Sequence, residues 1–114
     1  MKHHDPLRAA REAVAPNPSR PATAILQDSP DARLVVFRLA PGQSVAPHRS
    51  TSAVQLTVLS GSGVLAAEVG GAAVEEEYGT GAVVTYDPNE LHWMRATDEE
   101  MLLLATITPR PGAR

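Results

Sequence analysis

Two histidines in similar surroundings are the residues of this sequence best suited to do chemistry. The first, His48, ends the segment that begins at Gly42, and the second, His92, ends a segment that begins at Gly81 and passes through Pro88. Neutral imidazole is a ligand for Zn, Ni, Cu and Fe(II), and an imidazole of ordinary pKa also serves as a general base near neutral pH. The pair therefore predicts a metal site or an acid–base site, provided that the fold brings both rings together.

The segments that must position these histidines have the sequence pattern of short β-strands. From Ala22 onward, segments rich in Val, Leu, Thr and Ile alternate with Gly, Pro, Asp and Asn, as is typical of an all-β barrel or sandwich. The pair Gly70-Gly71 suits a two-residue hairpin. We expect strands near 22–27, 32–39, 44–47, 53–60, 63–69, 72–78, 82–86, 91–95 and 100–108.

The two ends of the chain lie outside this strand pattern. Residues 1–21 are expected to form an arm, in which Asp5-Pro6 starts a short helix that continues through Leu7–Val14 and ends before Pro16. The barrel is expected over residues 22–108, followed by a tail at 109–114.

Composition limits the classes of function. The chain has 114 residues, a formal net charge of -3 and no cysteine, which excludes disulfides, cysteine nucleophiles and thiolate metal sites. No basic stripe favours nucleic acid, and no apolar run approaches the length that crosses a bilayer. We therefore expect a cytoplasmic, single-domain protein that binds neither nucleic acid nor membrane.

The residues between 32 and 108 resemble the cupin family, and in particular its small single-domain members. The two Gly-to-His segments match the family's first and second motifs in order and spacing, and Val58-Leu59-Ser60-Gly61-Ser62-Gly63 is similar to its hairpin between them. The resemblance implies a cupin-type jelly-roll β-barrel with a peripheral N-terminal helix or arm. It also implies a homodimer, formed by packing of a sheet or by exchange of an N-terminal strand such as 22–27.

The motifs depart from the family at the metal ligands. The resemblance implies three histidines and one glutamate, of which this chain keeps His48 and His92. Ser50 stands where another histidine is expected, and the acidic position falls on Val54 or on Gln55, depending on how the spacer is counted. We therefore predict a divalent transition metal (Zn, Ni, Fe or Cu) on the two remaining histidines.

Strand alternation predicts which neighbours share the pocket with the histidines. Ser50 accompanies His48 and Met94 accompanies His92, whereas Trp93 points to the opposite face. Ser50, Gln55 and Met94 are the predicted ligand-pocket residues. Glu90 could supply a carboxylate ligand to the site, but we expect it in a solvent-facing turn. Arg38 and Arg95 are expected on the surface.

The sequence supports several functions for such a pocket and assigns no catalytic residue. The preferred prediction is a barrel that binds a metal through two histidines together with a small, largely apolar molecule, with an unknown reaction of oxygenase or isomerase type. The alternative is a non-catalytic module that binds or senses a small molecule without metal. A metal-free isomerase or cyclase, with either histidine as general base, is a further alternative.

Overall fold

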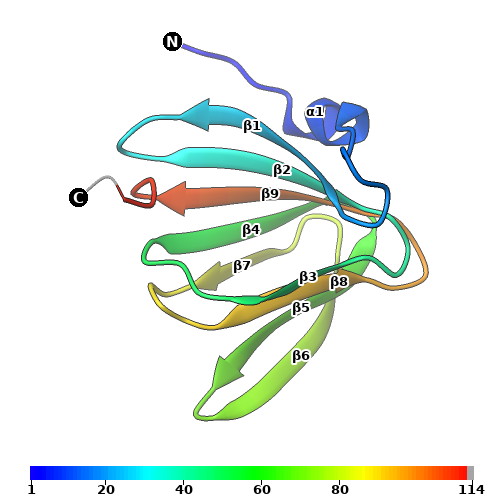
Figure 1. Cartoon of the computed structure of the whole chain (residues 1–114), viewed down its shortest axis with the longest axis vertical. Helices are drawn as coiled ribbons and strands as arrows, with labels where there is room; N and C mark the ends of the chain where they lie inside the picture. Colours follow the sequence, from blue (N-terminus) through cyan, green and yellow to red (C-terminus); the bar gives the residue numbers. More distant parts are fainter. Residues whose placement is uncertain (113–114) are drawn as a thin grey trace.

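The computed structural model describes residues 1–112 as one short helix and nine strands (Figure 1). Every strand end lies within one residue of the range expected from the sequence, and the all-β fold class with a peripheral N-terminal helix is confirmed. The expected tail at 109–114 is described only as far as Gly112, so its last two residues lie outside the described part. The elements are α1 (Pro6–Glu12), β1 (Ala22–Asp28), β2 (Arg33–Leu39), β3 (Ser44–His48), β4 (Ala53–Ser60), β5 (Ser62–Val69), β6 (Ala72–Gly79), β7 (Val83–Tyr86), β8 (His92–Ala96) and β9 (Met101–Thr108).

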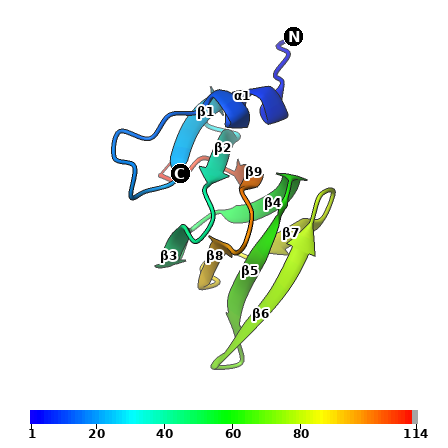
Figure 2. The same ribbon diagram turned by 90° about the vertical axis from the view of Figure 1, so that its right-hand side faces the viewer.

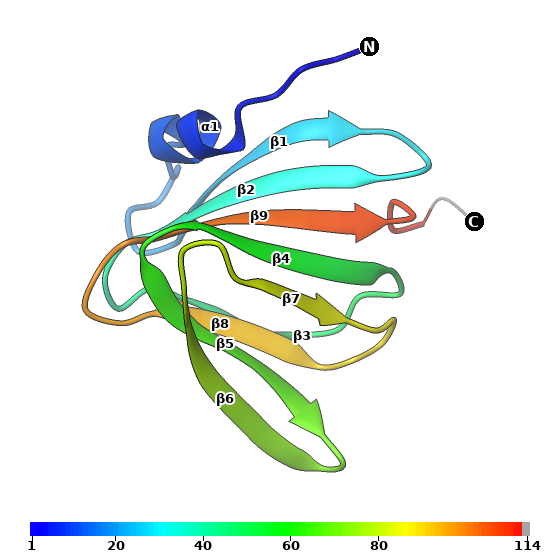
Figure 3. The same cartoon turned by 180° about the vertical axis from the view of Figure 1, so that it is seen from behind.

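The strands form two antiparallel sheets. One has the order β1-β2-β9-β4-β7 and the other the order β3-β8-β5-β6. Figures 1 and 3 show the first sheet fanned out over the strands of the second. The β5–β6 hairpin turns at Gly70 and Gly71, which both have positive φ, as a two-residue turn of this kind requires.

The core lies between the two sheets and follows strand alternation. On β9, Leu103 faces the interior and packs with Leu39, Val58 and Leu65 from both sheets, while Leu102 faces outward. The outward side of the five-stranded sheet is covered by α1, whose fully buried Ala10 packs against Leu102. Figure 2 shows α1 on the side of β1 and β2 that is remote from β5 and β6.

Helix α1 begins as the sequence predicts and ends earlier. Asp5 is the N-cap, its carboxylate accepts the backbone N–H of Arg8 at 3.1 Å, and Pro6 occupies the first turn. The helix ends at Glu12 because Ala13 already has an extended backbone, although its N–H still reaches the carbonyl of Ala10. No helix within residues 1–112 has the length and apolar character needed to cross a bilayer.

The outer face of the four-stranded sheet carries a small polar cluster. Glu75 on β6 accepts a hydrogen bond from the Trp93 indole N–H at 2.8 Å and pairs with Arg95 at 3.0 Å, both on β8. Trp93 and Arg95 therefore point away from the barrel interior, as predicted. The hydrogen bond from Trp93, and next that from Arg95, lowers the pKa of the Glu75 carboxyl below its ordinary 4.5.

This cluster predicts an acid transition that the only tryptophan can report. The charged carboxylate is the form that the folded state favours, so its contribution to stability is present above pH 4.5 and is lost as pH falls through the lower, folded-state pKa of Glu75. We expect Trp93 fluorescence to change with a midpoint below pH 4.5 and the transition to vanish in Glu75→Gln. A wild-type midpoint at or above pH 4.5 would contradict the hydrogen bond. Glu77→Gln, the next outward position of β6, is the matched control.

Candidate functional site

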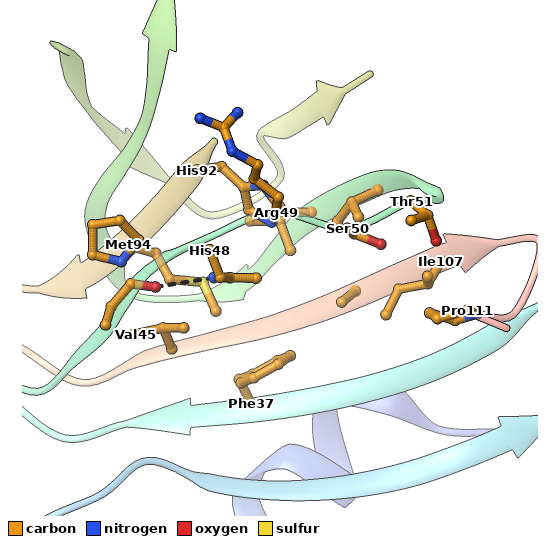
Figure 4. A pocket seen from close by; sticks show the side chains of 15 residues that line it. Phe37, Val45, His48, Arg49, Ser50, Thr51, His92, Met94, Ile107 and Pro111 are labelled. Atoms are coloured by element: carbon orange, nitrogen blue, oxygen red, sulfur yellow. Dashed lines mark hydrogen bonds between the residues drawn. The ribbon is translucent and has the colours of Figure 1, made fainter. Parts of the chain in front are cut away.

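A cavity of about 690 Å³ opens between the two sheets. Its wall is mostly apolar, and its polar residues come from the end of β3, the following loop and the start of β8 (Figure 4). Pockets of this size with few polar groups are typical of small-molecule sites. The lining residues are Phe37, Val45, Ala46, Pro47, His48, Arg49, Ser50, Thr51, Val54, Leu56, His92, Met94, Ala105, Ile107 and Pro111.

The fold brings the two predicted histidines into contact. His48 ends β3 and pairs with His92, the first residue of β8, and the ring centroids lie 4.2 Å apart with the planes tilted by 58°. The pairing depends on a bulge, since Val45 pairs with Met94 and the next pair is His48 with His92. The extra residue in β3 turns His48 to the same face as Val45, and Pro47, which has no N–H for the ladder, marks the irregularity.

Backbone carbonyls fix the tautomer of both rings. The Nδ1 atom of His48 lies 3.0 Å from the carbonyl oxygen of Ala46, and that of His92 lies 2.9 Å from the carbonyl oxygen of Glu90. A carbonyl only accepts, so each Nδ1 carries the hydrogen and donates it. In the neutral imidazoles each Nε2 is then left with a free lone pair, the arrangement in which histidine binds metals.

His92 is the more buried of the two histidines. Its side chain is only 5% exposed, and Tyr86 stacks on it at 4.5 Å between centroids with the planes 19° apart. Burial lowers the pKa of His92 below its ordinary 6.5, although the carbonyl of Glu90 raises it in part, so the neutral ring is favoured near neutral pH. Burial likewise raises the pKa of Tyr86 to about 12. Its hydroxyl has no hydrogen-bond partner among the described protein atoms.

The two residues on which the acidic position of the motif can fall, Val54 and Gln55, face opposite sides of β4. Val54 lines the cavity, whereas Gln55, expected in the pocket when the spacer is counted forward, lies on the exposed face of β4. Alternation along the strand permits only one of these neighbours to face inward. Glu90 does not line the cavity, because its carboxylate accepts the backbone N–H of Asp87 at 3.0 Å and closes the β7–β8 turn.

Two of the three predicted pocket residues line the cavity. The side chains near them also limit how many protein ligands a metal could have. Ser50 and Met94 lie in the wall beside the histidines. Across residues 1–112, no three His, Cys, Asp or Glu side chains come together as a metal-binding group. The donor set is therefore the two imidazoles of His48 and His92, each of which offers Nε2 because Nδ1 is hydrogen-bonded to a carbonyl. It fits a divalent transition metal held by two protein ligands, with its remaining positions left to water or to a bound molecule.

Sequence reasoning missed several residues around this site. Phe37 and Ile107 form the wall that faces the histidines, and Arg49 lies at the edge of the cavity (Figure 4). Tyr86 supports His92 from behind. Only Arg49 had a local signal, since it directly follows His48; the other three reach the site through sheet pairing.

Two sheets wound into one barrel, with a histidine pair facing an interior cavity, define a small protein of the double-stranded β-helix class. The chain belongs to the cupin family, because the model of the family described as Cupin domain matches residues 35–108. This family includes both enzymes and proteins without enzyme activity, and many of its members bind metals. No curated protein matches the sequence.

Solved structures of similar proteins share this fold. An RmlC-like cupin protein from Desulfovibrio desulfuricans is 28% identical, with 96% of this chain and 98% of that chain covered and a TM-score of 0.76. A protein from Thermus thermophilus is 23% identical, with 97% and 100% covered and a TM-score of 0.81. A predicted oxalate decarboxylase from Thermotoga maritima is 26% identical, with 78% and 80% covered and a TM-score of 0.68.

Proposed function

We propose that this cupin binds a small, largely apolar molecule in the cavity between its sheets, beside a divalent transition metal held by His48 and His92. The observation that carries the proposal is that two imidazoles meet on the wall of an apolar cavity, each with its Nδ1 hydrogen-bonded to a backbone carbonyl. A metal bound there would supply Lewis-acid chemistry to a molecule in the cavity.

The chain's own residues prepare this arrangement in three ways. The two carbonyl contacts hold the Nε2 lone pairs free, and burial keeps His92 neutral. Tyr86 restricts the ring plane of His92 by stacking on it. The apolar wall around Phe37 and Leu56 favours a ligand that buries hydrocarbon surface.

A non-catalytic binding module without metal is the second candidate, and one observation favours it. Val54, which lines the cavity, is apolar, so the set has two protein ligands where catalytic zinc sites use three. The cavity and its apolar wall remain in that case. A homodimer and a cytoplasmic location stay predictions.

Metal content after reconstitution tests the proposal. We expect dialysed, untagged protein to bind about one equivalent of Zn²⁺ or Ni²⁺, measured by elemental analysis and calorimetry. His48→Ala or His92→Ala should each weaken binding by roughly 100-fold, because four-ligand zinc sites at 10–16 kcal/mol correspond to about 3 kcal/mol per ligand.

Matched variants separate this site from other histidines. A chain without residues 1–4 removes His3 and His4, and it should bind metal as the full chain does. Failure to bind after reconstitution, or binding that survives both alanine variants, would sink the metal proposal and leave the metal-free module.

A further inference from the structure

The polar residues of the cavity wall are gathered at one place. His48, Arg49, Ser50 and Thr51 are consecutive, and His92 lies beside the first of them. All other lining residues are apolar and come from β2, β3, β4, β8, β9 and the chain after β9. A ligand whose chemistry matches these lining residues has one polar end and an apolar body.

The charge at this polar edge is positive and lacks an acidic partner. Within residues 1–112 no Asp or Glu side chain lines the cavity. The Arg49 guanidinium donates to the neutral carbonyl of Asn89 at 2.8 Å and forms no ion pair with a described carboxylate. By contrast, Arg38 and Arg95 are paired with Glu100 and Glu75 on outer surfaces. Arg49 is thus a cation at the rim whose charge is not neutralised.

The backbone beside Arg49 is held in place by the neighbouring loop. The Asn89 N–H donates to the carbonyl of Ser50 at 2.6 Å, while Arg49 donates back to the Asn89 carbonyl, so the loops after β3 and β7 are tied together. The Ser50 hydroxyl oxygen accepts the N–H of Ser52, which leaves the hydroxyl hydrogen free to donate. Donors fixed in this way lose little freedom when a ligand binds.

We propose that the ligand of this cavity is an amphipathic carboxylate. Its carboxylate pairs with Arg49 at the rim, and its apolar body lies among Phe37, Leu56 and Ile107. The inference rests on the proposed function that a small molecule occupies the cavity, and it names the chemical class of that molecule. It does not depend on bound metal.

The same wall discriminates against other head groups. A cationic head would meet Arg49 without an acid to balance it, so the two like charges would repel each other. A neutral head accepts a hydrogen bond from the guanidinium but supplies no counter-charge to it. Figure 4 shows the guanidinium turned away from Phe37, so the head is expected at the mouth and the apolar body inside.

Three ligands of equal chain length test the proposal in metal-free protein. Octanoate, octan-1-ol and octylamine have eight carbons each, of which octanoate uses one in its head, and their affinities are measured by calorimetry and ligand-observed NMR. We expect octanoate to bind about tenfold more tightly than octanol, since hydrogen bonds to charged groups are stronger than neutral ones, and octylamine to bind most weakly. Arg49→Gln should weaken octanoate binding about fivefold, as an exposed ion pair allows, and leave octanol unchanged.

Two further variants control for charge and folding. Arg8→Gln removes an exposed cation on α1, far from the cavity, and should leave all three affinities unchanged. Arg49→Lys keeps the charge and should retain the preference for octanoate, even if Arg49→Gln folds poorly.

Each contrary result has a separate meaning. Equal binding of all three ligands, or a preference for octanoate that Arg49→Gln does not reduce, overturns the carboxylate inference and leaves the proposed function standing. Failure of all three ligands to bind overturns ligand binding in the cavity, and this inference with it.

Discussion

Gly61→Ala is expected to destabilise the barrel by about 3 kcal/mol or more, from left-handed strain together with steric overlap. Gly61 links β4 of one sheet to β5 of the other, with φ at +81°. A methyl group there would overlap the backbone carbonyl oxygen of Glu100, in the β8–β9 connection. Neither group can give way, because both belong to backbone segments that cross between the sheets. Urea unfolding at constant m value would measure the loss.

Gly42→Ala is the matched control for this prediction. Gly42 has the same φ of +81°, but an added Cβ would have no atom within 4 Å. Its alanine variant should therefore lose only the cost of the left-handed backbone, about 1–2 kcal/mol. Equal losses in the two variants would show that backbone strain alone, without the contact to Glu100, accounts for the requirement for glycine at position 61.

The strands and turns of this fold were predictable because their signals are local. Apolar β-branched stretches bounded by Gly, Pro and Asp give the strand limits without knowledge of the partners. The paired histidines were also predictable, since the Gly-to-His segments carry the family resemblance. Trp93 was correctly expected to face outward, because alternation along a short strand has only two outcomes.

The remainder of the site depends on register and on contacts between distant residues. Counting the spacer in either direction put the acidic position on Val54 or on Gln55, and a one-residue shift reverses which side faces the cavity. The bulge in β3 arises from its pairing with β8, whereas the stacking of Tyr86 on His92 and the link from Arg49 to Asn89 are contacts between residues of different sheets or loops. No single segment contains that information.

Val54→Glu should convert the two-histidine set into one with a carboxylate ligand. Val54 lines the cavity with the histidines and is 6% exposed, and β4 pairs it with Tyr86, on which His92 stacks. A third ligand worth about 3 kcal/mol should raise affinity for Zn²⁺ or Ni²⁺ roughly 100-fold, measured by calorimetry. Without metal the variant should melt below wild type, because a carboxylate replaces a buried apolar side chain.

Gln55→Glu is the control that tests which face of β4 is turned toward the histidines. It adds the same carboxylate one residue further along β4, on the exposed face, and should change neither metal affinity nor melting temperature appreciably. Added metal should raise the melting temperature of Val54→Glu more than that of wild type or of Gln55→Glu, because tighter binding to the folded state stabilises it more. A gain in affinity at position 55 but not at 54 would mean that β4 presents its opposite face to the histidines.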